Sequence, residues 1–271
     1  MQVAYLAEEW GMHATVAQSM GGFRFGNLAE VRYFLKYATS MDGISISKDQ
    51  WEEAKKRTLD RYATSKCVNV MRHVFADFEK THKVYYRSDL QEFIFESNIE
   101  DFITADGNSI FISTIHKAKG REFDTVYLMA PLPNILNVED MRSYYVGLTR
   151  AKRNLYLLQN PAEEMSSVSV TLTMRDVWLD FFKDRKELVL RLRSGDLLTY
   201  HDGSLRNCEG NTIIKLSASG REKIKVWQDK GYRVTKAEVS YTLAWRPVDE
   251  NTDYAVCLAD IILTADEEDS H

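Results

Sequence analysis

The stretch IFISTIHKAKGREFDTVYLM, residues 110–129, decides the fold class. It begins with the apolar run 110–113 and ends with the run 125–129, both rich in β-branched and aromatic residues. Short apolar runs of this kind are typical of buried strands in a parallel sheet. The residues between the runs carry a hydroxyl, an imidazole, two lysines, an arginine, a glycine and two carboxylates. This polar segment fits catalysis, ligand binding or only a polar turn.

The segments around this stretch alternate between helix and strand patterns. A helix is expected over residues 138–150, and a further short strand over residues 155–158. Upstream, HATVAQ at residues 13–18 predicts a strand, and a helix is expected from Asn27, whose spacing to Glu30 resembles a capping box. This alternation indicates an α/β layered domain.

Residues 40–106 are expected to be mostly helical. Two Ser-x-x-Gln pairs, Ser47 with Gln50 and Ser88 with Gln91, are typical of helix N-termini. Apolar residues keep a helical period through this region, so we expect three or four short helices. These helices form an insertion between the opening elements and the next strong strand.

A change of pattern near residue 165 marks a second domain. The first domain, residues 1–165, contains the helical insertion, whereas residues 166–271 repeat short apolar strands between turns rich in Gly and Asp. Such a pattern predicts a small β-rich, barrel-like domain. Bases and aromatic residues are interspersed over residues 215–245. They form the core and rim of the barrel or, alternatively, a surface that docks nucleic acid or protein.

The composition excludes several classes of protein. No apolar run approaches the roughly 20 residues of a membrane helix, and the first residues lack the layout of a signal peptide. The formal net charge of -5 argues against a general polyanion binder, although a local basic surface can still bind phosphates. Cys67, Cys208 and Cys257 lack metal-ligand spacing, so we expect buried thiols in a reducing compartment. A cytoplasmic protein without a membrane partner is therefore expected.

Three segments of the sequence resemble one family of motor proteins. TIHKAKGREFDTVYL, residues 114–128, is similar to motif V of the superfamily 1 DNA helicases of the UvrD, Rep and PcrA type. YYVGLTRAKRNLYLL, residues 144–158, is similar to their motif VI. GGFRFGNLAEVRYFLKYA, residues 21–38, resembles a segment that precedes both motifs. The three segments occur in the family's order, and the resemblance covers roughly residues 1–160.

The resemblance implies half of an ATP-driven motor. Residues 1–165 would form the second RecA-like domain of a helicase, a parallel-sheet domain with a short helical insertion at about 40–106. In this family ATP lies between two RecA-like domains, and single-stranded DNA crosses both. The sequence contains no G-x-x-x-x-G-K-[ST] loop to hold the ATP phosphates. We therefore expect a fragment of a longer helicase that does not hydrolyse ATP alone.

The same resemblance implies the cofactors and partners. ATP and Mg would be bound in the intact helicase mainly by the first RecA-like domain, which carries the P-loop. No cofactor and no metal site are therefore expected in this chain alone. The expected partners are that P-loop domain and single-stranded or partly duplex DNA. In a bacterium the protein would be nucleoid-associated and would serve a process such as DNA repair.

The nucleotide-binding residues follow from matching positions in the motifs. Arg150 would be the arginine finger, a permanently charged planar fork that stabilises charge on the transferred phosphoryl group. Glu122 would accept hydrogen bonds from the ribose, since a carboxylate suits a diol. Gly120 would permit a tight turn and a close approach of the nucleotide. The alternatives are a surface arginine at a helix end, a solvated acid and a simple turn glycine.

The DNA-binding residues follow from the first part of motif V. Thr114 and His116 would hydrogen-bond phosphate oxygens of single-stranded DNA without sequence preference, and Lys117 would add electrostatic attraction. The alternatives are a structural histidine and plain surface charge. Thr149 is expected to orient or cap the turn of motif VI.

Two features depart from the family. Arg121 stands where the family usually has an apolar residue, so the packing of the motif V loop is expected to differ. The helical insertion is also much shorter than the large insertion domain of UvrD. The alternative function is a motor-derived, non-catalytic module that has lost ATP chemistry and binds DNA or protein. An unrelated hydrolase is disfavoured because the sequence has no G-x-S-x-G and no H-E-x-x-H motif.

Overall fold

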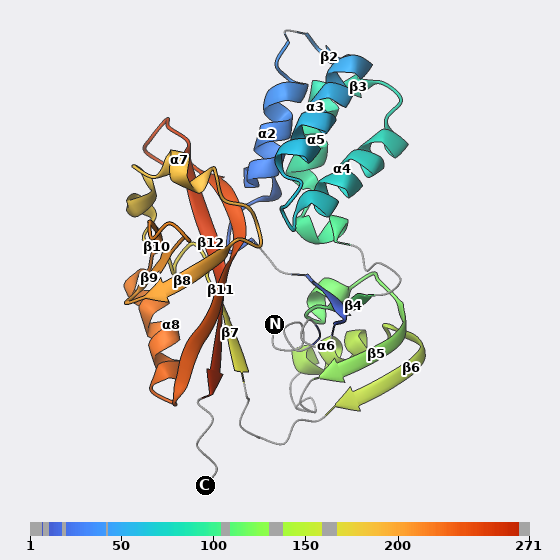
Figure 1. Ribbon diagram of the computed structural model, residues 1–271. Coiled ribbons are helices and arrows are strands. Elements are labelled where there is room, and N and C mark those ends of the chain that lie inside the picture. The colour runs from blue at the N-terminus through green and yellow to red at the C-terminus, as the bar shows by residue number, and fades with distance from the viewer. Residues whose placement is uncertain are drawn as a thin grey trace. The chain divides into compact units, whose positions relative to one another are not determined.

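The protein folds as two compact units, each made of two segments of the chain. The computed structural model describes residues 7, 11–17, 20–41, 43–103, 109–129, 138–158 and 167–265 (Figure 1). The first unit combines Met1–Gln18 with Ala105–Ser166, and the second combines Ser19–Thr104 with Ser167–His271. The helical residues thus belong to the same compact unit as the β-rich residues, whereas the sequence placed them in the first domain as an insertion.

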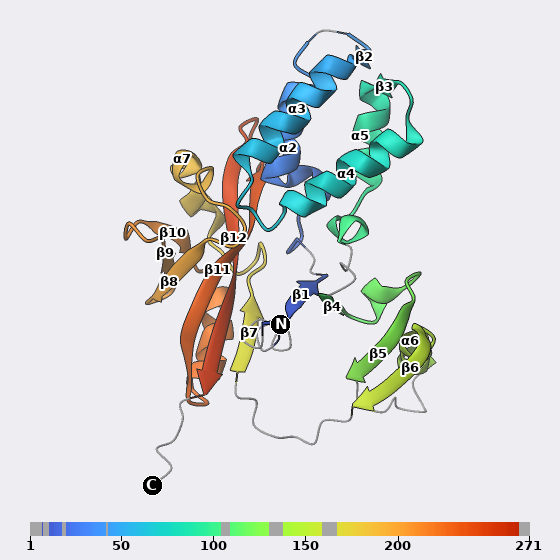
Figure 2. The same ribbon diagram turned by 45° about the vertical axis from the view of Figure 1, so that its right-hand side comes forward.

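The first unit contains two pairs of parallel strands. Strand β1 (His13–Val16) pairs with β4 (Ser109–Ile112), and β5 (Phe123–Met129) pairs with β6 (Ala151–Leu158). Helix α6 (Val138–Leu148) connects β5 to β6, as Figure 2 shows. The predicted strands, their parallel direction and the helix between them are confirmed. Among the described residues, the four strands form two separate sheets.

The burial of β4 and β5 differs from the prediction of buried strands, since no residue of β4 is buried. Leu128 is the buried residue of β5, and every residue of β6 after Ala151 is exposed. Leu128 is covered by α6, where a methyl group added at Gly147 would lie 3.0 Å from the Leu128 Cδ1 atom. An apolar run favours a strand, but its burial depends on the elements that cover it, and sequence periodicity does not identify those elements.

The helices of the second unit pack around an aromatic core. The order is η1 (Phe25–Asn27), α2 (Ala29–Ala38), β2 (Ser45–Ile46), α3 (Lys48–Arg61), α4 (Val68–Thr81), β3 (Tyr85–Tyr86), α5 (Arg87–Glu96) and η2 (Ile99–Phe102). Trp51 is fully buried, and its ring lies 5.1 Å from those of both Phe34 and Phe78. Rings at such distances add specific aromatic contacts to the burial of apolar surface. The expected helical region is confirmed.

The helix starts test three predicted caps. Ser47 Oγ accepts a hydrogen bond from the Gln50 backbone N–H at 3.2 Å, so the predicted cap of α3 is confirmed. The cap predicted at Asn27 is wrong, because α2 starts after Leu28 and the Asn27 side chain accepts from the Arg24 backbone N–H. The prediction at Ser88 is also wrong, since α5 begins at Arg87.

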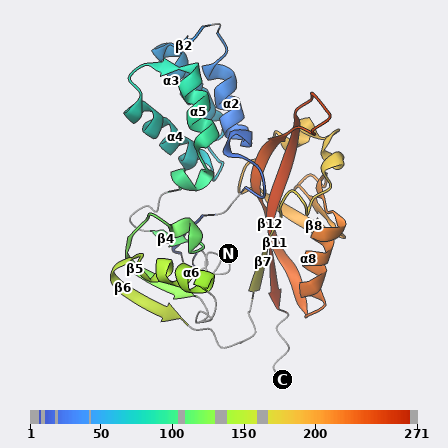
Figure 3. The ribbon, with the colours of Figure 1, turned by 180° about the vertical axis from the view of Figure 1, so that it is seen from behind.

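The β-rich part is a curled antiparallel sheet. Its strands are β7 (Ser167–Thr171), β8 (Leu197–His201), β9 (Ser204–Arg206), β10 (Thr212–Lys215), β11 (Tyr232–Trp245) and β12 (Tyr254–Ala265). They lie in the order β10-β9-β8-β11-β12-β7, with the two long strands β11 and β12 side by side (Figure 3). The sheet is compatible with the predicted β-rich, barrel-like domain. Short helical turns, η4 (Leu179–Phe182) and α7 (Lys186–Val189), precede β8.

Helix α8 (Ala218–Gln228) was not predicted from the sequence. It begins after Ser217, whose side chain accepts from the Gly220 backbone N–H. A methyl group at Gly220 would lie 2.1 Å from the Asp176 carbonyl oxygen, so only glycine fits this close approach. Asp176 itself is buried and forms an ion pair with Lys223 of the same helix at 2.7 Å. The bases of this segment therefore lie on a helix.

The helical and β-rich parts of the second unit share polar and apolar contacts. Lys66 Nζ forms an ion pair with Glu238 at 2.7 Å, and the Lys66 backbone N–H donates to the Ser194 carbonyl at 3.0 Å. Leu28 forms an isolated bridge with Leu243 of β11. These contacts explain why the two parts form one compact unit. No described helix has the length and apolar character needed to cross a membrane.

The cysteine prediction is only partly correct. Cys67 and Cys257 are buried free thiols, as expected, and burial raises the pKa of each. Cys208 is also a free thiol, but it is exposed, so its predicted burial is wrong.

Candidate functional site

The polar segment after β4 folds as a tight turn. The Thr114 carbonyl accepts hydrogen bonds from the backbone N–H groups of Lys117 at 3.1 Å and Ala118 at 3.2 Å, which forms η3 (His116–Ala118). Ala118 is buried and anchors the turn, whereas the side chains of Thr114 and His116 are exposed. The turn therefore presents a hydroxyl and an imidazole at the end of a strand, where a ligand can reach them.

Lys117 is half-buried, unlike its two predicted DNA-binding neighbours. Its Nζ donates to the Ala17 carbonyl at 3.2 Å, just after β1. The Ala17 backbone N–H in turn donates to the Ile112 carbonyl at 2.9 Å. The lysine thus links the turn to the end of the β1–β4 pair, and its ammonium group has a structural contact besides any role toward phosphates.

Gly120 ends the turn with a backbone that favours glycine. Its φ angle is +83°, in the left-handed region that residues with a Cβ rarely adopt. A methyl group at this position would meet nothing within 4 Å in the described part of the chain. The glycine is therefore explained by the conformation of the turn, and the space beside it is open.

Arg150 connects the turn to the end of helix α6. Its Nε donates to the Val146 carbonyl at 2.9 Å, its Nη1 to the Arg121 carbonyl at 3.2 Å, and its Nη2 to Thr149 Oγ1 at 3.0 Å. The Arg150 carbonyl also accepts from the Phe123 backbone N–H at 2.9 Å. Two segments 29 residues apart in the sequence are thus joined by one arginine.

Glu122 lies between Arg121 and the first residue of β5. It is exposed and forms a 3.7 Å ion pair with Lys152, which is also exposed. Exposed pairs of this length contribute little, about 0–1 kcal/mol, because water screens both charges. The carboxylate oxygens of Glu122 thus remain accessible to a ligand.

Arg121 stands where the family usually has an apolar residue, and its contact with Phe111 explains how the turn accommodates it. The Arg121 guanidinium lies 4.9 Å from the centroid of the Phe111 ring, which stacks on Phe123 at 5.4 Å. A cation over an aromatic face is attracted by the quadrupole of the ring, so this arginine packs where an apolar residue is usual. Phe111 was missed as part of the site, because only its contacts in space show its role.

The residues predicted to bind nucleotide lie beside one another, whereas the residues predicted to bind DNA lie further along the same turn. Arg150 contacts the carbonyl of Arg121, the residue between Gly120 and Glu122. Thr114 and His116 lie at the opposite end of the same turn. No group of three His, Cys, Asp or Glu side chains in the described ranges could hold a metal ion. The chemistry at hand is therefore a guanidinium and a carboxylate, groups that suit a phosphate and a ribose.

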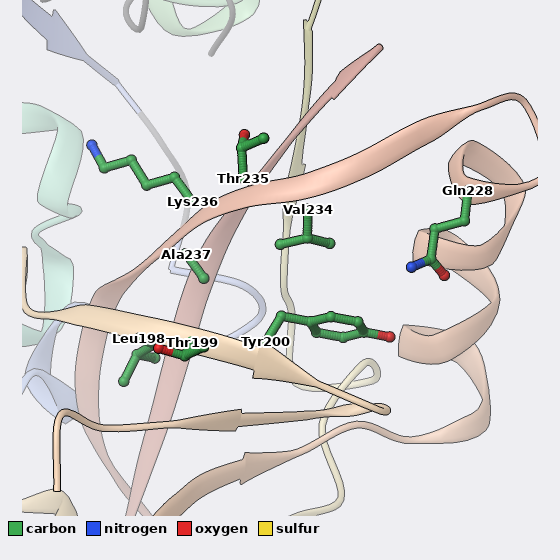
Figure 4. Close-up of a pocket in the computed structure, with 8 residues that line it drawn as sticks. All are labelled: Leu198, Thr199, Tyr200, Gln228, Val234, Thr235, Lys236 and Ala237. Atoms are coloured by element: carbon green, nitrogen blue, oxygen red, sulfur yellow. The ribbon is translucent and has the colours of Figure 1, made fainter. Parts of the chain in front are cut away.

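A separate pocket lies in the second unit, where two strands of the sheet diverge. The pairing of β8 with β11 includes Leu198 with Ala237. Beyond this pair the pocket is lined by residues such as Tyr200, Val234 and Gln228, the last from the end of α8 (Figure 4). Lys236, another lining residue, belongs to the stretch of bases and aromatic residues at 215–245 that the sequence offered as an alternative docking surface.

Comparison with known proteins identifies the family of the chain. Residues 26–161, half of the chain, match the UvrD-like helicase C-terminal domain family. The protein belongs to this family, and the matched range includes the helices of the second unit as well as the turn and Arg150.

Curated relatives agree with this assignment. The chain is 31% identical over 116 residues to a probable DNA helicase II homolog of Rickettsia conorii and to another of Rickettsia felis. It has the same identity over the same length to the DNA helicase II of Rickettsia typhi. In each case the match covers 38% of this chain and 17% of the relative. The chain therefore corresponds to a small part of these helicases.

Proposed function

We propose that this chain is the C-terminal motor half of an ATP-dependent DNA helicase or translocase, and that its first unit is the second RecA-like domain. The observation that supports the proposal is the bond from Arg150 to the Arg121 carbonyl, which joins the two family motifs into one site. Membership of the UvrD-like helicase C-terminal domain family and the names of the relatives agree with it.

In this proposal Arg150 is the arginine finger. It stabilises negative charge on the phosphoryl group that leaves ATP, while a P-loop domain on another part of the motor holds ATP and Mg. Glu122 accepts hydrogen bonds from the ribose hydroxyls, and Gly120 keeps the turn open beside it. The finger and the ribose ligand act on a nucleotide that the partner domain delivers, so this chain alone does not hydrolyse ATP.

Thr114, His116 and Lys117 contact single-stranded DNA in this proposal. Their groups suit phosphate oxygens, which carry no sequence information. The turn that presents them ends at Gly120 and Arg121, so DNA and nucleotide contact two ends of one short segment. A change at one end can therefore affect the other, which is the coupling that translocation requires.

Two measurements on the purified chain test the proposal. ATP hydrolysis should be absent from the chain alone and should appear, stimulated by single-stranded DNA, when the P-loop domain of the same helicase is added. Hydrolysis by the chain alone, or no hydrolysis by the combination, would contradict this assignment.

DNA binding by the chain is the second measurement. The affinity for a labelled single-stranded oligonucleotide should fall in Thr114→Ala and His116→Ala. In Lys117→Ala the dependence of log Kd on log salt should also decrease by about one. Lys186→Ala, at an exposed lysine of α7 outside residues 215–245, is the matched control. Equal affinities for all these proteins would contradict the assignment of Thr114, His116 and Lys117 to DNA.

A further inference from the structure

We infer that Thr149 is a positioning residue for Arg150, and that its hydroxyl sets the orientation in which the guanidinium meets the phosphoryl group. The inference rests on the proposed function, since it assumes that Arg150 acts on ATP. It adds a residue whose contribution comes through Arg150 alone.

The hydroxyl of Thr149 forms two hydrogen bonds of suitable geometry. Its Oγ1 donates to the Val146 carbonyl at 3.0 Å and accepts from Arg150 Nη2 at 3.0 Å. A hydroxyl carries one donor and two acceptor sites, so both bonds form at once. The first bond fixes the hydroxyl against helix α6. The second bond lets the fixed hydroxyl orient the guanidinium.

The guanidinium of Arg150 is held on several sides. Together with Thr149, the carbonyls of Val146 and Arg121 engage three of its five N–H groups among the described residues. By this count each terminal nitrogen still has a second N–H to offer to phosphate oxygens. A planar fork that is already oriented loses less freedom when it binds, which favours the transition state.

A purely structural role for Thr149 is the alternative that the test must separate. The Arg150 backbone N–H bonds to the Gly147 carbonyl at 3.2 Å, so the Val146 carbonyl at the end of α6 is satisfied by the side chains of Thr149 and Arg150. If capping were the only role, loss of the hydroxyl would lower the stability of α6 but would not depend on Arg150.

The test is a double-mutant cycle in the helicase that carries this chain together with its P-loop domain. Thr149→Val keeps the shape and removes the hydroxyl, Thr149→Ser keeps the hydroxyl, and both are combined with Arg150→Ala. We expect Thr149→Val to lower kcat for DNA-stimulated ATP hydrolysis about 10- to 100-fold, with little change in KM. Thr149→Ser should stay near the wild type, and Thr149→Val/Arg150→Ala should equal Arg150→Ala alone.

The outcomes separate this inference from the proposed function. Wild-type kcat in Thr149→Val, or losses that multiply in the double variant, would overturn the inference while an inactive Arg150→Ala leaves the proposed function standing. Full activity of Arg150→Ala would overturn both. Thermal unfolding of each variant checks the fold, and Thr149→Ala replaces Thr149→Val if the valine does not fit.

Discussion

Strands β6 and β12 belong to the two units of the chain and differ in how they are covered. Every residue of β6 after Ala151 is exposed, whereas β12 buries nine consecutive residues, 255–263. The motif residues lie in the unit that buries little, and polar bonds from Arg150 hold its turn in place. The second unit is held by apolar and aromatic packing. Substitutions in the second unit should therefore affect stability, and those in the first should affect function.

The largest loss of stability is expected from Trp51→Ala. This side chain is fully buried and contacts the rings of Phe34, Phe78 and Tyr85. Removing it should lower the free energy of unfolding of the second unit by about 3–5 kcal/mol, through lost burial and a cavity. Urea unfolding measures the loss. Trp178→Ala, a half-exposed tryptophan, is the control and should cost clearly less, because nearly half of its surface already contacts water. Equal losses for both would remove the distinction between core and surface.

The next largest loss of stability, about 3 kcal/mol, is expected from Gly220→Ala. The added methyl group would meet the Asp176 carbonyl oxygen at 2.1 Å, and a backbone atom cannot move aside without displacing α8. The melting temperature should fall accordingly, while Lys225→Ala in the same helix should leave it unchanged. An unchanged melting temperature in Gly220→Ala would show that α8 does not approach Asp176 so closely.

A glycine-to-alanine substitution in the first unit, Gly147→Ala, should change the stability much less. Gly147→Ala would place its methyl group 3.0 Å from Leu128 Cδ1, the end of a flexible side chain. The gain in helix propensity, about 0.5–1 kcal/mol, offsets part of the crowding. We expect a net change below about 1 kcal/mol, measured by hydrogen exchange in α6. A loss as large as that of Gly220→Ala would indicate that the first unit is packed as tightly as the second.

The smallest expected effect is a pH dependence of stability caused by Glu30, which is buried in the second unit. Burial raises the pKa of Glu30 above its ordinary value of 4.5, although Ser65 Oγ donates to its Oε1 at 2.8 Å. The folded state thus favours the protonated form, and this contribution is complete below the ordinary pKa and lost as pH rises through the folded-state pKa. Glu30→Gln cannot ionise, so its stability relative to the wild type should increase from pH 4 to pH 8.

Unfolding in urea at several pH values measures this difference. Glu52→Gln, at an exposed position of α3, is the matched control for the same change of side chain. A difference between Glu30→Gln and the wild type that stays constant with pH would contradict the raised pKa of Glu30.

The sequence predicted elements better than their surroundings. Local patterns predicted the strands near residues 110 and 125, and the structure confirms them. They also predicted helix α6, which precedes β6, and the cap at Ser47. The exposure of β6 did not follow, because burial depends on elements distant in the sequence. Helix α8 was missed because its Gly220 looks like a turn residue until the Asp176 carbonyl is placed beside it.

The sequence predicted which residues form the candidate site, but it did not predict the contacts between them. The motifs identify Arg150, Glu122 and Thr114 as candidates, yet no spacing shows that the Arg150 guanidinium bonds to the Arg121 carbonyl and to Thr149. Such bonds depend on side-chain conformation and on the return of the chain after 29 residues. The roles of these residues toward ATP and DNA stay predictions.

DNA-stimulated ATP hydrolysis by the helicase that carries this chain tests the role of Arg150 most directly, when Arg150→Ala is compared with Arg153→Ala. Arg153 is an exposed arginine three residues away that pairs with Asp124. We expect Arg150→Ala to lower kcat by about 10³- to 10⁵-fold with the fold intact, and Arg153→Ala to stay near the wild type. Equal activity of the two variants would contradict this role of Arg150.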